Sequence, residues 1–193
     1  IGLFVRGKFP EEKKKTIAIV GARSCSNYGK ETAKYFGRKL GEKGIQVISG
    51  LARGIDSYAH TGALGTIGST FGVLGCGIDI CYPRENIELY TYIEEAGGII
   101  SEYGLGVKAL PGLFPMRNRI ISGLSDGILV IEAKGKSGSL ITVDYGLEQG
   151  KDIYAVPGRI SDASSEGCNN LIKMGAKLVT CVEDILEEFI PDC

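Results

Sequence analysis

The sequence predicts an α/β fold in which a mostly parallel sheet of about seven strands carries helices on both faces. Short apolar runs recur along the chain, and segments with helical patterning lie between them. The runs are apolar on both faces, which is typical of parallel strands that helices cover on both sides. Glycine directly follows several of these runs, so the chain can turn sharply where a strand ends.

Seven apolar runs are predicted to be strands, and a predicted helix follows each of them. The strands are TIAIVG (16–21), QVISG (46–50), STFGVLG (69–75), GGIISEY (97–103), DGILVIEA (126–133), DIYAVPG (152–158) and AKLVT (176–180). The helices are expected over 28–43, 55–65, 86–96, 115–124, 137–149, 168–175 and 182–189. Residues 1–15 indicate an entry strand and a charged surface turn. Because no linker, repeat or low-complexity tract follows, we expect residues 1–193 to form a single domain.

The composition excludes several classes of protein. Hydrophobic residues make up 44% of the 193 residues, charged residues 23%, and the net charge is −1. This charge argues against a globally basic nucleic-acid-binding surface but allows a local basic patch. Every apolar run is far shorter than the ~20 residues that a membrane span needs, and no basic-then-apolar leader opens the chain. We therefore expect a cytoplasmic protein without a membrane segment. The chain opens with Ile1 rather than Met, as an excised domain would.

Cysteine and histidine usage argues against a metal site. The six cysteines show no C-x-x-C spacing, and the chain has one histidine, so the usual zinc ligand sets are missing. We expect no metal and reduced, mostly buried thiols.

Four segments that follow strands carry the residues of chemical interest. In open α/β sheets, ligands bind at the carboxyl edge of the strands, near the point where strand order reverses. The four segments should therefore meet at one rim. They are VGARSCSNYG (20–29), SGLARGIDSYAH (49–60), FPMRNR (114–119) and AKGKSGSLIT (133–142).

The first segment predicts a phosphate site rather than a dinucleotide site. Gly21 is followed by an alanine, Arg23 and Ser24, and the next glycine is Gly29, so the G-x-G-x-x-G fingerprint is absent. The remaining turn offers amides, hydroxyls and one arginine, which suit a phosphate. No cofactor is expected. The alternative for Arg23 is an ordinary surface salt bridge.

The second segment places Arg53 between Gly50 and Gly54, and it puts Asp56 and His60 on one face of a helix. An Asp–His pair could be catalytic. We favour the interpretation that Asp56 caps and orients the helix while His60 hydrogen-bonds locally. No G-x-S-x-G elbow places a nucleophile, so no catalytic residue is predicted.

The third segment raises the question why Arg117 and Arg119 stand near the positive end of a helix dipole. With Pro115 near the first helical position, a spacing of 100° per residue turns Arg117 toward the core and Arg119 the opposite way. An arginine in the place of Arg117 needs an anion. The candidates are a buried carboxylate, such as Glu132 or Glu102, and a bound phosphate.

Phe114 precedes these arginines at an expected loop tip. There its ring could be a stacking platform for a nucleobase. The alternative is a hydrophobic plug.

The fourth segment predicts an anion site at a helix start. With the helix starting at about Ser137, the backbone amides of Gly138 and Ser139 point out of its end and need no side-chain charge to bind an anion. Lys134 and Lys136 add positive potential. A plain helix cap would explain Ser137 alone.

Five motifs in order carry a resemblance to a known family. IAIVGAR, SGLARGIDSYAH, FPMRNRIISGLSDGILVIEA, SGSLITVDYGLEQGKDIYAVPG and SEGCNNLIKMGA resemble the core of the DNA-processing protein A (DprA/Smf) family over nearly the whole chain. The resemblance implies an extended Rossmann-like fold that binds single-stranded DNA, protects incoming DNA and helps load the RecA recombinase in natural transformation. It also implies a dimer without a known catalytic step. Family members usually carry a small N-terminal helical domain and often a C-terminal winged-helix-like one, and this chain has room for neither.

The DNA- or phosphate-binding site that we assign on this basis draws on all four segments. It comprises Gly21, Arg23, Ser24, Gly50, Arg53, Gly54, Phe114, Arg117, Asn118, Arg119, Ser137, Gly138 and Ser139. Lys134 and Lys136 lie outside the family motifs and are added on the charge argument.

Two other functions stay open. Phosphoribohydrolases of the similar lysine-decarboxylase-like fold use a PGGxGTxxE stretch at the same turn, and Thr142 stands here in place of its glutamate. The acid/base group is then missing, and Glu132 or Asp144 could replace it only by awkward geometry. A small-nucleotide sensor would bind one phosphate in the same pocket, without the gain in affinity with strand length that marks a strand binder.

A homodimer is expected through the C-terminal part of the fold, around CNNLIKMGAKLVT. Leu171, Ile172 and Met174 fall on nearly adjacent helical positions, which is more apolar surface than one buried face requires. The alternative is a helix packed wholly inside the domain.

Overall fold

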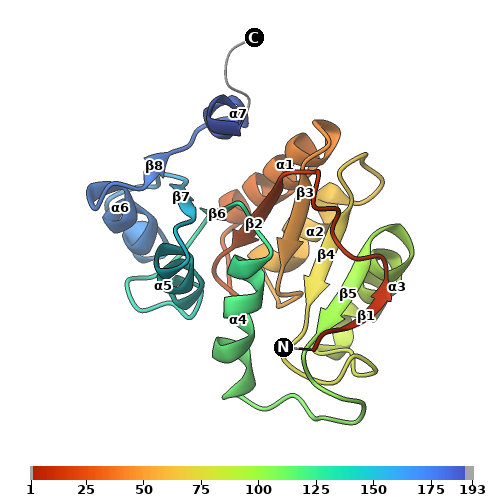
Figure 1. Ribbon diagram of the computed structural model, residues 1–193. Helices are drawn as coiled ribbons and strands as arrows, with labels where there is room; N and C mark the ends of the chain where they lie inside the picture. Colours follow the sequence, from red (N-terminus) through yellow and green to blue (C-terminus); the bar gives the residue numbers. More distant parts are fainter. Residues whose placement is uncertain (1, 190–193) are drawn as a thin grey trace.

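The computed structural model describes residues 2–189, which form one eight-stranded sheet between two layers of helices (Figure 1). The strands are β1 (Phe4–Gly7), β2 (Thr16–Val20), β3 (Gln46–Ser49), β4 (Thr70–Val73), β5 (Gly98–Ser101), β6 (Gly127–Val130), β7 (Asp152–Ala155) and β8 (Lys177–Leu178). The helices are α1 (Asn27–Glu42), α2 (Ile55–Ala63), α3 (Ile87–Ala96), α4 (Leu113–Gly123), α5 (Leu140–Glu148), α6 (Glu166–Lys173) and α7 (Glu183–Phe189). Two short 3₁₀ turns are η1 (Arg84–Asn86) and η2 (Ala163–Ser165).

The sheet has the order β1-β5-β4-β3-β2-β6-β7-β8. All neighbouring strands are parallel except β1, which pairs antiparallel with β5. The chain runs outward from β2 through β3 and β4 to β5, and then crosses back to β6 on the other side of β2. Strand order therefore reverses between β2 and β6, which is where an open α/β sheet places its ligand.

The core lies on both faces of this sheet because the central strands are apolar throughout. All five residues of β2 are buried. Ile17 and Ile19 pack in one core cluster with residues of α1, α2 and α7. Ala18 and Val20 pack in the other with residues of α4, α5 and α6. Successive side chains of a strand point to opposite faces, so each layer of helices covers one of these two sets.

The predicted fold class is confirmed, with one strand more than expected. All seven predicted strands and all seven predicted helices are present, within a few residues of the expected bounds. The eighth strand, β1, lies in the region where the sequence indicates an entry strand. The helix expected from Ser137 begins at Leu140 instead, because successive turns precede it: Ser137 N donates to Lys134 O at 3.1 Å and Leu140 N to Ser137 O at 3.0 Å.

Two further sequence expectations concern the membrane and the thiols. None of the described helices is long and apolar enough to cross a membrane. Five cysteines are free thiols, of which Cys76 and Cys168 are buried. Burial raises the pKa of the Cys76 thiol to about 11 and that of the Cys168 thiol to about 12, so both stay protonated near neutral pH. Cys193 lies outside the described residues.

Candidate functional site

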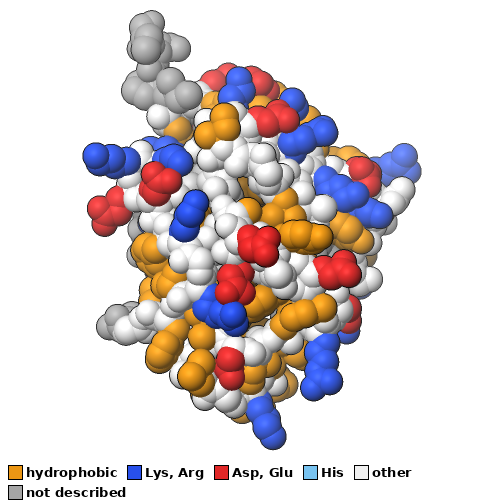
Figure 2. Space-filling view, turned by 90° about the vertical axis from the view of Figure 1, so that its right-hand side faces the viewer, with side chains coloured by type: hydrophobic (Ala, Val, Ile, Leu, Met, Phe, Trp, Pro, Cys, Tyr) orange, Lys and Arg blue, Asp and Glu red, His pale blue; other side chains and the backbone are white. Residues whose placement is uncertain are grey.

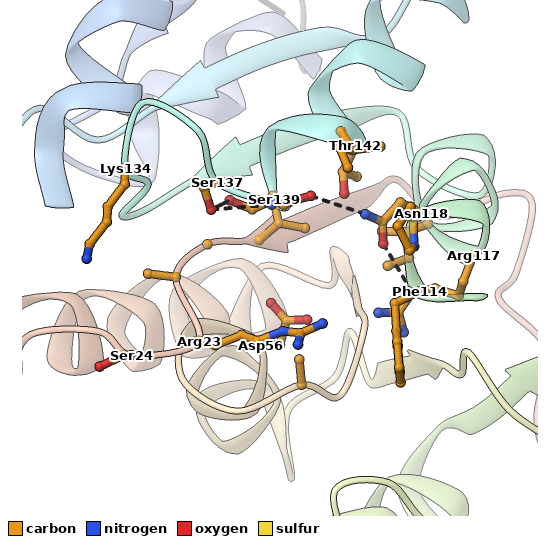
Figure 3. Close-up of a pocket in the computed structure, with 18 of the residues that line it drawn as sticks. Arg23, Ser24, Asp56, Phe114, Arg117, Asn118, Lys134, Ser137, Ser139 and Thr142 are labelled. Atoms are coloured by element: carbon orange, nitrogen blue, oxygen red, sulfur yellow. Dashed lines mark hydrogen bonds between the residues drawn. The ribbon is translucent and has the colours of Figure 1, made fainter. Parts of the chain in front are cut away.

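The four predicted segments meet at the carboxyl edge of the sheet, beside the reversal between β2 and β6, and surround a pocket of about 570 Å³ (Figure 3). Most of the predicted site residues line this main pocket: Gly21, Arg23, Ser24, Phe114, Arg117, Asn118, Lys134, Lys136, Ser137, Gly138 and Ser139. A recess of about 40 Å³ adjoins it, and Gly50 and Arg53 line this recess. Gly54 and Arg119 line neither cavity.

Gly54 allows two loops to pack closely and does not contact the pocket. Its φ of +76° lies in the region that favours glycine, and a Cβ there would overlap the carbonyl groups of Ala22 and Arg23. The next residue, Ile55, donates its backbone N–H to Ala22 O at 3.2 Å. Gly54 thus lets the β3–α2 loop pack directly on the β2–α1 loop, which brings two walls of the pocket together.

Arg117 is buried at the floor of the pocket, on the core-facing side of α4 as predicted. Its side chain is 3% exposed. Nη1 donates to Gly50 O at 2.7 Å and also to Val73 O, so the guanidinium ties α4 to the ends of β3 and β4. A Cβ on Gly50 would lie 2.6 Å from Arg117 Nη2 and 2.7 Å from Asp56 Oδ2, which shows how closely these groups are packed.

Asp56 is the carboxylate next to Arg117, and the expectation of Glu132 or Glu102 in that role is wrong. Burial lowers the pKa of Arg117 to about 10, and the charge of Asp56 opposes that shift. Burial raises the pKa of Asp56, and Arg117 opposes that shift in turn. Asp56 Oδ2 also accepts the Gly50 N–H at 3.1 Å, so the carboxylate braces a loop rather than capping α2 with its side chain. The expected capping role is therefore wrong.

Two of the predicted cations are paired with carboxylates of the chain itself. Arg119 points away from the pocket, as predicted, and forms an ion pair with Glu102. Arg53 forms a two-point pair with Glu85, in which Nη2 lies 2.8 Å from Oε2. A phosphate that approaches Arg53 has to compete with Glu85.

His60 does not pair with Asp56. It is fully buried, and its Nδ1 lies 2.7 Å from Thr70 Oγ1. Burial lowers the pKa of His60 to about 3, so the ring is neutral near neutral pH. The local hydrogen bond expected from the sequence is present, and the arrangement provides no catalytic pair.

The N-terminus of α1 is already filled by an anion of the chain itself, the carboxylate of Glu132. Glu132 is 3% exposed and accepts hydrogen bonds from Ser26 N at 2.8 Å and from Ser26 Oγ. Ser26 Oγ in turn accepts the Gly29 N–H at 3.0 Å, as the helix cap. A dinucleotide fold presents its pyrophosphate to this helix end. The phosphate that the first segment predicts is therefore left with Arg23 and Ser24, which are both exposed.

Among the described residues, the turn before α5 contributes no acidic side chain to the lining of the pocket. Ser137 Oγ and Ser139 Oγ lie 2.8 Å apart, and Asn118 Nδ2 donates to Gly138 O at 3.4 Å, which links the turn to α4. Lys134, Lys136 and Gly138 are exposed. Figure 3 shows this turn facing Arg23 across the pocket. The turn before α5 is thus the candidate anion site of the pocket, and Arg23, Lys134 and Lys136 line the same pocket.

Two aromatic side chains form the remaining wall. Phe114 lies in the first turn of α4 and is partly buried, so the expected exposed loop tip is wrong. Its ring centroid lies 5.4 Å from that of Tyr82, which sequence reasoning missed. Tyr82 follows β4 in the chain, and the rule that loops after parallel strands meet at one edge would have included it.

The fold and the site together define a Rossmann-like protein with a pocket at the carboxyl edge of its sheet, lined by Arg23, Lys134 and Lys136. The helix end that holds the pyrophosphate in dinucleotide folds is occupied here by Glu132. The chain matches the family described as DNA recombination-mediator protein A over residues 1–190, and it belongs to this family. The resemblance drawn from the sequence motifs is therefore confirmed.

Three relatives place the chain within the family. It is 46% identical to the DNA processing protein DprA of Streptococcus pneumoniae over 97% of this chain and 66% of that protein. The X-ray structure of that protein superposes with a TM-score of 0.92, covering 98% of this chain and 67% of that one. It is 46% identical to the protein Smf of Escherichia coli over 96% of this chain and 50% of that protein. The chain thus spans half to about two thirds of the length of these relatives.

The third relative is the DNA processing protein A of Helicobacter pylori. Its structure superposes with a TM-score of 0.87 at 28% identity, over 97% of this chain and 86% of that one. That structure is described as giving insight into a single-stranded DNA binding mode.

Proposed function

We propose that the chain binds single-stranded DNA in the main pocket and acts as a recombination mediator that protects incoming DNA and helps load the RecA recombinase in natural transformation. The charge of the pocket wall carries this proposal. Arg23, Arg117, Lys134 and Lys136 line it, and Asp56 is the acidic residue of the lining. Asp56 is 8% exposed and lies beside Arg117, so the surface open to a ligand is cationic.

This excess of cations is local. The whole chain has a net charge of −1, and on the face shown in Figure 2 basic and acidic side chains are interspersed. A basic patch on a chain without a basic coat favours a defined anionic ligand over non-specific contact with any polyanion. Family membership and the strand-binding relative from H. pylori support DNA as that ligand. We place the action of the protein in the cytoplasm.

Binding measured against strand length and salt tests the proposal. Affinity should rise from thymidine monophosphate to dT10 and dT20, and it should fall with salt by a slope of about 0.7 per phosphate contact. Lys134→Ala should lower that slope by about 0.7, whereas Lys43→Ala, an exposed lysine outside the pocket, should leave it unchanged. Equal affinity for the mononucleotide and dT20 would instead favour a nucleotide sensor.

We propose that this pocket binds without catalysis. Thr142 lines it at the position of the hydrolases' glutamate and is 1% exposed. Glu132 is engaged by Ser26, and neither it nor Asp144 is among the lining residues. Incubation with AMP or CMP should therefore release no free base. Release in proportion to protein, abolished by Asp56→Asn, would contradict this part of the proposal.

We also propose a homodimer through the C-terminal part of the fold. Strand β8 is one of the two edge strands of the sheet, and its Leu178 is 46% exposed. Met174, at the end of α6, is 75% exposed, while Leu171 packs in the core. Light scattering at tens of micromolar should give a dimer mass that Met174→Asp reduces. Ile67→Asp, at a 74% exposed site in another loop, is the matched control, and a monomeric wild-type chain would refute the dimer.

A further inference from the structure

Tyr82 stands where the main pocket and its recess join. It lies in the loop between β4 and η1, and it lines both cavities together with Arg23, Ala52 and Phe114. Its side chain is 45% exposed. A large aromatic ring that is half exposed at the join of two cavities has a free face to offer to a ligand.

The neighbouring ring, Phe114, is partly covered by the protein. Tyr82 lies against it at 5.4 Å between centroids, with the ring planes 36° apart. The Cζ atoms of Arg23 and Arg117 lie 5.4 Å and 5.9 Å from the Phe114 centroid. Phe114 Cδ1 packs on the backbone of Gly75, where a Cβ would lie 2.8 Å away. Phe114 therefore supports its neighbours and is less exposed than Tyr82.

We propose that Tyr82 is the base-stacking residue of this pocket: a nucleobase of the bound strand lies on the exposed face of its ring, and Phe114 supports the ring from behind. This inference rests on the proposed binding of single-stranded DNA. It assigns the hydrophobic contact to a side chain outside the four segments that the sequence singled out.

The cations around Tyr82 fit a strand that passes over it. Arg23 lines both cavities, Arg53 lines the recess, and Lys134 and Lys136 line the main pocket. The backbone of a strand whose base lies on Tyr82 would therefore run through cavities that are lined by guanidinium and ammonium groups. Stacking on an aromatic ring is tolerant of sequence because every base has a π-face, so this contact serves a protein that accepts any strand.

Substitutions at Tyr82 measure the contact directly. Tyr82→Ala should weaken binding of dT20 by about 5- to 150-fold with an unchanged salt slope, because stacking is lost and no phosphate contact is. Tyr82→Phe keeps the ring and should restore affinity to within about twofold of wild type. A strand of abasic residues of equal length should bind wild type and Tyr82→Ala equally, which separates stacking from a merely structural role.

A fluorescent variant tests the same contact without weakening the site. The chain contains no tryptophan, so Tyr82→Trp introduces a single indole. Stacking of a thymine on that indole should quench its emission when dT20 binds. Tyr92→Trp is the matched control, because Tyr92 is 57% exposed on α3 and lines neither cavity. Its emission should not change.

The outcomes distinguish this inference from the proposed function. If wild type does not bind dT20, the proposed function fails. If wild type binds but Tyr82→Ala keeps its affinity and the indole at position 82 is not quenched, the stacking role of Tyr82 is refuted. If Phe114→Ala then loses affinity for dT20 but not for the abasic strand, the base stacks on Phe114 instead.

Discussion

The starts of helices α1 and α5 lie on the same edge of the sheet. The start of α1 is occupied by a carboxylate of the chain itself, whereas the start of α5 faces the open pocket. At α1, Glu132 supplies a carboxylate from within the chain, bonded to Ser26 N and Oγ. At α5, the turn through Gly138 faces the pocket with lysines beside it. Both helix ends carry the positive end of a helix dipole, which attracts an anion. The difference teaches that the anion site of such a fold is decided by which helix end the chain has already satisfied.

Arg117→Ala should have the largest effect, because Arg117 is a buried cation whose hydrogen bonds and countercharge lie within the chain. Its removal leaves Gly50 O and Val73 O without a donor and the buried Asp56 without its countercharge. We expect a loss of about 3–5 kcal/mol in the free energy of unfolding, measured by denaturant titration. Lys43→Ala, an exposed lysine, is the control for stability.

Strand binding by the same variant shows whether Arg117 also holds a phosphate, as the sequence predicts. If it does, binding weakens alike for every sequence and the salt slope falls by about 0.7. Lower stability with unchanged affinity and slope for a ~20-mer would show that Arg117 acts within the fold alone.

Glu132→Ala should open the closed helix end. Two charge-assisted hydrogen bonds from Ser26 are lost, and we expect a destabilisation of about 2–3 kcal/mol. Added sulfate should then restore part of the melting temperature beyond any effect on wild type, since the vacated site accepts an anion. Equal effects of sulfate on both proteins would show that the α1 end binds no external anion even when Glu132 is absent.

Gly138→Asp should close the open helix end in the manner of Glu132. A Cβ at Gly138 meets no atom within 4 Å, so the substitution fits without strain. The new carboxylate should weaken binding of dT20 by about tenfold and lower the salt slope by about 0.7. Gly138→Asn has nearly the same shape without the charge and should bind close to wild type. Equal loss in both variants would point to shape rather than charge.

Glu85→Gln should give the smallest effect, a gain of about two- to fivefold in affinity. Arg53 is held by Glu85 in a two-point ion pair at the rim of the recess. Without that pair its guanidinium is free for a phosphate, and the salt slope should rise by about 0.7. Glu88→Gln, in the first turn of α3, is the control. An unchanged slope in Glu85→Gln would place Arg53 outside the path of the strand.

Most of the fold could be predicted from the sequence because buried parallel strands are continuous apolar runs. Strand β1 gave a weaker signal, since all four of its residues are exposed and its apolar pattern does not mark a buried face. The start of α5 was misplaced because glycine and serine suit a turn as well as a helix end.

The candidate site could be predicted in position but not in all its contacts. Helical spacing was enough to predict that Arg117 faces the core, because the direction of a side chain depends on its position within one helix. Its partners Gly50 and Val73 lie 67 and 44 positions away along the chain, so local patterns carry no information on them. The same holds for Arg53 and Arg119, whose partners only tertiary packing brings into reach.

Closure of the α1 end by Glu132 also bears on competition inside the cell. Rossmann-like proteins that present this helix end to solvent accept the pyrophosphate of NAD and related metabolites there. In this chain a covalently attached carboxylate holds that position at an effectively constant local concentration. We therefore expect the pyrophosphate of these dinucleotides to be excluded from the α1 helix end, so that they do not bind this chain in the way they bind those proteins.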